Sequence, residues 1–159
     1  MIKNNIELKK INLGFEIDVG APLPTVLSND YNLFLLFHKG KQEDNEMMFV
    51  TFINKIALKF SNIPSHSDIV GHPYSKYGLN EIDSSLFEVK NSDWIKELKR
   101  INSFTNDSHT TIDLSNFKHY IFLFHDSTFE CIAKSFEIKE LKGKYKEDIL
   151  SKAIKELEK

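Results

Sequence analysis

Two neighbouring runs of strand-forming residues, 118–125 and 128–136, limit the possible fold of this chain more than any other feature of its sequence. Both runs are rich in aromatic and β-branched side chains, and only Asp126 and Ser127 separate them. Such a pattern is typical of a β-hairpin with a two-residue turn. The sequence therefore predicts a pair of antiparallel strands in its last third.

A turn at 126–127 pairs residue 125 with 128 and residue 123 with 130. One face of the hairpin then carries apolar side chains, namely Tyr120, Phe122, Phe124, Phe129, Cys131 and Ala133. The other face carries His119, Ile121, Leu123, His125, Glu130, Ile132 and Lys134. A three-residue turn would shift the pairing by one residue, so this assignment depends on the turn. We predict that the first face is buried and that the imidazole and carboxylate groups of the second meet solvent or a ligand.

Strand patterns recur at 13–19, 31–38, 47–53 and 84–89. They either alternate apolar with polar residues, as half-buried strands do, or are apolar throughout, as central strands are. Residues 56–60 either continue the third of these strands beyond a kink at Asn54 and Lys55 or form a short separate partner. Both readings remain open at the level of sequence.

Two helices complete the prediction. The first begins after Asn91 or Ser92, with Trp94 anchoring it to the sheet, and the second spans about 144–158. Strands follow strands instead of alternating with helices, which favours an α+β fold with a curled, mainly antiparallel sheet of six or seven strands. A β-sandwich with helical decoration is the alternative. The length of 159 residues suits a single domain, 1–159.

Charge and composition exclude several classes of protein. The net charge is −2, and Arg100 is the only arginine among 21 basic residues, which disfavours a nucleic-acid binder. The apolar runs are far shorter than the ~20 residues that span a bilayer, which argues against a membrane protein. The first residues lack the apolar core of a signal peptide, and Cys131 is the only cysteine, which excludes an internal disulfide. Together these features predict a cytoplasmic protein.

A loop over 61–83 and the tip of the hairpin hold the candidate site. A loop of about 20 residues inside a small domain is uncommon and often functional. We single out five residues as the candidate binding site, His72, Tyr74, His125, Asp126 and Glu130. Histidine and carboxylate groups can serve in general acid–base chemistry when they converge.

The spacing of these groups does not point to a catalytic or metal site. His119 and His125 share a strand face but lie about 20 Å apart along it, too far to bind one metal ion. Cys131 falls among phenylalanines, where the thiol pKa rises and a nucleophilic thiolate is rare. The sequence contains no HExxH, GxSxG, Walker A or GxGxxG motif. We therefore expect no catalytic residue, no metal and no cofactor.

Several short segments in this order resemble a group of small bacterial proteins to which no activity is attached. The segments are His72-Pro73, Gly78-Leu79, Phe87-Glu88-Val89, Asn91-Ser92-Asp93-Trp94-Ile95, 118–122 and 124–131. The resemblance covers residues from about 60 to 135 and is most specific in the hairpin. It implies a bacterial source and a single domain, and it suggests that the long loop, the helix start and the hairpin turn lie together.

The sequence thus predicts a non-enzymatic binding or interaction domain, in which loop 61–83 and the hairpin tip recognise a protein partner or a small ligand. The alternative is a small enzyme or ligand-binding barrel that uses His72, His125, Asp126 and Glu130 around a concave sheet. A third possibility is self-assembly through the C-terminal helix or an exposed sheet edge. The oligomeric state stays open.

Overall fold

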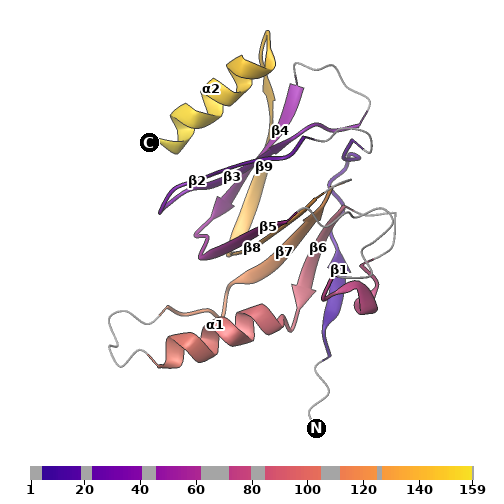
Figure 1. The fold of residues 1–159 in the computed structure, drawn as a ribbon, viewed down its shortest axis with the longest axis vertical. Helices are drawn as coiled ribbons and strands as arrows, with labels where there is room; N and C mark the ends of the chain where they lie inside the picture. The colour runs from indigo at the N-terminus through magenta and orange to yellow at the C-terminus, as the bar shows by residue number, and fades with distance from the viewer. Residues whose placement is uncertain are drawn as a thin grey trace.

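The structure, a computed structural model, describes residues 5–18, 23–40, 46–61, 72–79, 85–104, 112–124 and 127–158. These residues form nine strands in two antiparallel sheets, with a helix at each end of the molecule (Figure 1). The five-stranded sheet contains, in spatial order, β1 (Glu7–Lys10), β6 (Leu86–Lys90), β7 (Lys118–Leu123), β8 (Thr128–Ala133) and β5 (Ala57–Ser61). The four-stranded sheet contains β2 (Thr25–Ser28), β3 (Leu33–Phe37), β4 (Glu46–Ile53) and β9 (Ser135–Lys142). The helices are α1 (Asp93–Ser103) and α2 (Lys146–Leu157), and η2 (Ser75–Tyr77) is a short 3₁₀ turn.

The two sheets are joined by a bent ribbon of two strands. β4 pairs with β9 and β5 pairs with β8, so β4 runs on into β5 while β8 runs on into β9. At the bend, the backbone N–H of Ile56 donates to Ile132 O at 2.9 Å, and that of Lys134 donates to Ile53 O at 3.0 Å. Asn54 adopts a left-handed backbone with φ of 53°, which asparagine tolerates better than most residues. Of the two readings of this region, the kinked strand is correct.

The nine strands form two antiparallel sheets that this ribbon joins, where the prediction had a single sheet of six or seven strands. The predicted α+β fold is confirmed. The two sheets face each other across the main core, which is the feature that the sandwich alternative anticipated. The predicted strand over 13–19 is wrong for its described residues, 13–18, which form only an isolated antiparallel bridge from Ile17 to Lys39; residue 19 lies outside the described residues.

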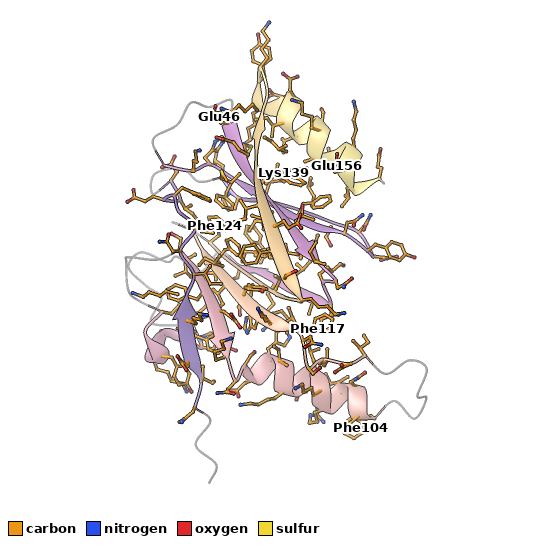
Figure 2. All side chains as sticks on the ribbon, turned by 180° about the vertical axis from the view of Figure 1, so that it is seen from behind. Glu46, Phe104, Phe117, Phe124, Lys139 and Glu156 are labelled. Carbon is orange, nitrogen blue, oxygen red and sulfur yellow. The ribbon has the colours of Figure 1, made fainter. Side chains whose placement is uncertain are left out.

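The main core lies between the two sheets and is built largely from aromatic rings. Phe37 of β3 contacts Phe124 at 5.3 Å between ring centroids, and Phe52 of β4 contacts Phe129 at 5.4 Å. Figure 2 places Phe124 in this interior and Phe104 at the outer end of α1. All six side chains of the predicted apolar face are buried in this core, namely Tyr120, Phe122, Phe124, Phe129, Cys131 and Ala133.

The register of the hairpin differs from the predicted one by two residues. Leu123 pairs with Thr128, and the N–H of Phe124 donates to Ser127 O at 2.9 Å. The predicted partner of residue 123 was Glu130, which pairs instead with Ile121. Because side chains alternate with a period of two, a shift of two residues leaves each side chain on its predicted face.

A helix covers the outer face of each sheet. Ile149 and Ala153 of α2 pack on the four-stranded sheet. Trp94, Ile95 and Leu98 of α1 pack around Ile132 of the five-stranded sheet, as predicted for Trp94. Within the described ranges, neither helix combines the length and the apolar character needed to cross a membrane.

Candidate functional site

Four polar side chains are buried together on the outer face of the five-stranded sheet. His119 projects from β7 and Glu130 from β8, while Ser92 begins α1 and His72 precedes η2. This is the face that the sequence analysis assigned to solvent or a ligand. That assignment is wrong for His119 and Glu130, because α1 and residues 72–79 cover the face.

We call these four residues the buried relay, because their polar atoms lie in a row in space, each close to the next. Ser92 Oγ lies 2.8 Å from His119 Nδ1, and His119 Nε2 lies 2.9 Å from Glu130 Oε2. The other carboxylate oxygen, Glu130 Oε1, lies 3.4 Å from His72 Nε2. Glu130 therefore bridges two imidazole rings from segments that are far apart in the sequence.

Local backbone structure holds the two ends of the buried relay. Ser92 is the N-cap of α1, and its Oγ accepts the backbone N–H of Ile95 at 3.2 Å. His72 Nδ1 accepts the backbone N–H of Tyr74 at 3.2 Å. The hydrogen of His72 is thereby placed on Nε2, on the side of Glu130, although it is too poorly aligned to form a hydrogen bond.

Burial and pairing decide the charges in the buried relay. Burial acts against the charge of Glu130, but the interactions with His119 and then His72 outweigh it and lower the pKa of the carboxyl to about 2. For His119, burial lowers the pKa and outweighs the opposing attraction of Glu130. A neutral His119 must donate Nε2–H to the carboxylate, which leaves Nδ1 to accept the Ser92 hydroxyl hydrogen.

Aromatic side chains close the buried relay from outside. Trp94 and Tyr74 both meet the His119 ring edge-on, at 5.2 and 5.5 Å between centroids. Lys59 of β5 places its ammonium 3.8 Å from the Trp94 ring centre. Burial also raises the pKa of Tyr74, so its phenol stays protonated. The buried relay is therefore separated from solvent by a layer of rings.

Three of the five predicted site residues come together here: His72, Tyr74 and Glu130. His125 and Asp126 lie outside the described residues. The sequence analysis recognised Ser92 only as a helix cap and did not connect His119 with Glu130. The predicted register placed those two side chains far apart along the hairpin, whereas the observed pairing of Glu130 with Ile121 makes them diagonal neighbours.

The order of atoms in the buried relay, hydroxyl to imidazole to carboxylate, is that of a nucleophile with its base. The Ser92 side chain is enclosed, however, with the residue only 3% exposed, and its oxygen is already occupied by the helix cap. Cys131 is buried in the main core, where burial raises the pKa of its thiol well above the ordinary value. Within the described part of the chain, no three histidine, cysteine or acidic side chains are arranged to hold a metal ion.

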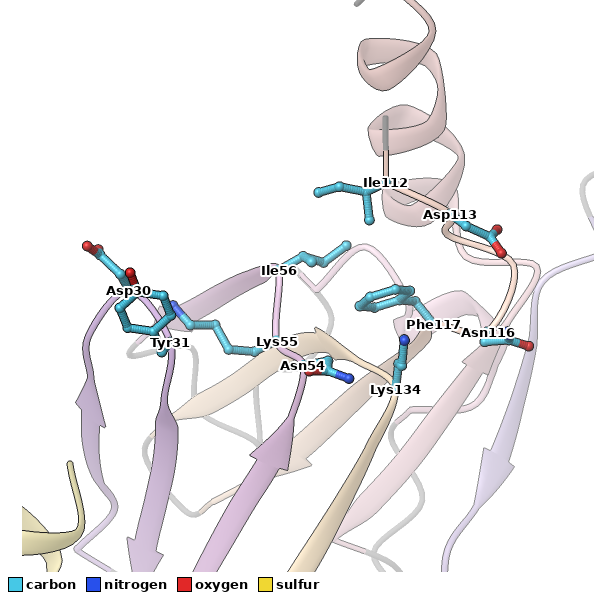
Figure 3. A pocket seen from close by; sticks show the side chains of 10 residues that line it. All are labelled: Asp30, Tyr31, Asn54, Lys55, Ile56, Ile112, Asp113, Asn116, Phe117 and Lys134. Atoms are coloured by element: carbon cyan, nitrogen blue, oxygen red, sulfur yellow. The ribbon is translucent and has the colours of Figure 1, made fainter. Parts of the chain in front are cut away.

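Two open clefts lie beside α1, and both border residues with exposed side chains. The first, which we call the corner cleft, has a volume of about 450 Å³ and lies where the ribbon bends between the sheets. Figure 3 shows Tyr31 and Lys55 on one side of it and Phe117 and Lys134 on the other. Its remaining lining residues are Asp30, Asn54, Ile56, Ile112, Asp113 and Asn116.

The second cleft, which we call the lysine cleft, has a volume of about 410 Å³ and lies between α1, the end of β6 and the start of β7. Four lysines surround it: Lys90, Lys96, Lys99 and Lys118. It shares Asn116 and Phe117 with the corner cleft, so the two are adjacent. Ser92, the buried N-cap of α1, is also among its lining residues, so the lysine cleft lies next to one end of the buried relay.

Comparison of the chain with models of protein families, with curated proteins and with solved structures gave no match. The geometry and the charges described above therefore carry the functional argument.

Proposed function

We propose that this chain is a binding domain that recognises a protein partner with the two clefts beside α1 and does not act as an enzyme. One observation carries the proposal. The titratable groups suited to catalysis are enclosed and paired with each other, whereas the clefts present aromatic, amide and lysine side chains to solvent. This surface differs from loop 61–83 and the hairpin tip, much of which lies outside the described residues.

An exposed aromatic residue on an ordered turn supports binding at the corner cleft. Tyr31 is 84% exposed and sits in the turn between β2 and β3. Asn29 fixes this turn, because its Oδ1 accepts the N–H groups of Tyr31 at 2.9 Å and Asn32 at 2.7 Å. Lys55 Nζ donates to Asn29 O at 2.7 Å. Exposed tyrosines on rigid supports are frequent anchors of protein interfaces.

The buried relay gives the lysine cleft a fixed wall. Ser92 caps α1 and hydrogen-bonds His119, so the connection from β6 to α1 is tied to the sheet. Asn91, whose φ is 56°, adds a hydrogen bond from Nδ2 to Asn5 O at 2.8 Å. A surface held in place before binding loses less entropy when a partner docks.

Photo-crosslinking tests the proposal. Benzoylphenylalanine replaces Tyr31 in the corner cleft, and in a matched control it replaces Tyr145, which is also exposed but begins α2 at the other end of the molecule. We expect a specific protein adduct in the source cells from position 31 and none from position 145. Equal labelling from both positions, or none from position 31, would contradict the proposal.

A second candidate function, hydrolysis of an ester or amide, rests on the Ser92–His119–Glu130 geometry. Ser92 follows a strand and a left-handed residue and begins a helix, an arrangement that also presents nucleophilic serines in hydrolases. A fluorophosphonate probe decides between the two functions. We expect no covalent adduct by intact-protein mass spectrometry, whereas an adduct on Ser92 that is lost in Ser92→Ala would establish the hydrolase.

A further inference from the structure

We propose that the lysine cleft receives an acidic segment of the partner protein, in which carboxylate side chains flank an apolar one. This inference rests on the proposed binding function and names the chemistry of the ligand. It is carried by the charge of the cleft, by its apolar lining residues and by its continuity with the corner cleft.

The charge around the lysine cleft is opposite in sign to that of the whole chain. Four lysines and a single acidic residue, Glu88, line it, although the net charge of the chain is −2. Lys90 pairs with Glu88, and Lys96 pairs with Asp93 at 3.1 Å. Lys99 and Lys118 make no ion pair with any residue that the structure describes. A cleft lined by one sign of charge concentrates ligands of the opposite sign.

Apolar side chains also line the lysine cleft. They are Val89, Ile95, Leu114 and Phe117, among polar neighbours such as Asn91 and Asn116. A phosphate or sulfate ion gains nothing from contact with these apolar side chains. An aliphatic or aromatic side chain placed between two carboxylates would pack against them. Each apolar side chain that leaves water in this way favours binding.

The position of the cleft favours a protein segment over a nucleic acid. The lysine cleft and the corner cleft share Phe117 and Asn116, so an extended segment could run from the lysines to Tyr31. Nucleic-acid recognition relies on arginine forks, and Arg100, the only arginine, is held by Glu97 through contacts of 2.7 and 2.8 Å. Arg100 does not line either cleft.

Fluorescence anisotropy with a labelled peptide of alternating glutamates around a central phenylalanine tests this inference. We expect binding that weakens as salt is raised, and a loss of about tenfold or more in Lys99→Glu/Lys118→Glu. The matched control, Lys146→Glu/Lys155→Glu, makes the same charge change on α2 and should bind as the wild type does. Circular dichroism of each variant verifies that it is folded.

Three outcomes would overturn the inference: a peptide with glutamine for glutamate that binds as well, an oligonucleotide that binds more tightly, or displacement of the peptide by low concentrations of inorganic phosphate. The last would assign the cleft to a phosphate ligand. Crosslinking from position 31 distinguishes a failure of the acidic-segment proposal from a failure of the proposed binding function. An adduct that forms equally in Lys99→Glu/Lys118→Glu would refute the acidic segment alone, whereas the absence of any adduct would refute the binding function.

Discussion

The outer faces of the two sheets are covered in different ways. On the four-stranded sheet, α2 packs against an entirely apolar cluster that includes Phe34, Phe49 and Ile149. On the five-stranded sheet, α1 and residues 72–79 cover the buried relay, in which one carboxylate joins two imidazoles. Apolar packing needs only shape, whereas a buried ionised group must keep every partner in place. The comparison shows that α1 covers buried ionisable groups that contact one another, whereas the buried layer under α2 is apolar; the lysine cleft is lined by α1.

The largest expected effect comes from the apolar side. Phe49 is buried beneath α2 and contacts the Phe34 ring at 4.8 Å between centroids. Phe49→Ala should lower the free energy of unfolding by about 3–5 kcal/mol, because it leaves a cavity in a close-packed layer. Urea denaturation at several pH values measures the loss, which should be the same at pH 7 and pH 5.

Acid should destabilise the α1 side instead. The pKa of Glu130 is about 2 in the folded protein, below its ordinary value of 4.5, so its stabilising contribution is present above pH 4.5 and is lost as the pH falls toward 2. The lowered pKa of His119 acts in the same direction below pH 6.5, because the unfolded state takes up a proton first. We expect a loss of about 3 kcal/mol from Glu130 over this range.

Glu130→Gln provides the matched variant for that prediction. It should be less stable than the wild type at pH 7 and should lack the part of the acid-dependent loss that belongs to Glu130. Thermal unfolding followed by circular dichroism between pH 2 and pH 7 measures both. If Glu130→Gln and the wild type lose stability in parallel, the carboxylate is not held in its charged form by the imidazoles.

Removing the Ser92 hydroxyl should have the smallest effect. Ser92→Ala deletes the helix cap and the partner of His119 Nδ1, which should cost about 1–2 kcal/mol. It should also loosen the wall of the lysine cleft. Hydrogen exchange at the amides of Trp94 and Ile95 is the measurement, and amides in α2 are the internal control. Unchanged exchange at Ile95 would show that the cap does not order this wall.

The two sides also differ in how well the sequence predicted them. The inner face of the hairpin was predicted correctly from Tyr120 to Ala133, because its two-residue period survives a register shift of two. The start of α1 is equally local: the sequence limited its cap to Asn91 or Ser92, and the structure has Ser92. The alternating segment at 13–18 was misread, because alternation of apolar and polar residues does not show whether pairing with a neighbour extends beyond a single bridge.

The buried relay could not be predicted from local patterns. It needs the true hairpin register to place His119 beside Glu130, and it needs the segment at His72 to fold back over the sheet. The sequence did contain one indication of the buried relay: His119 and Glu130 fall on the same predicted face of the hairpin, next to the start of α1. Sequence spacing cannot reveal which distant segment covers such a face.

The central claim is that the buried relay is closed and structural, which leaves recognition to the clefts. Nitrogen-15 NMR of histidine-labelled protein, with His119→Gln to assign the resonance, tests it directly. We expect the His119 ring at pH 7 to be neutral, with its proton on Nε2, and to take up a second proton only below pH 6.5. A His119 ring that titrates freely near pH 6.5 would contradict the account, since the imidazole would then be open to solvent and available as a base for Ser92.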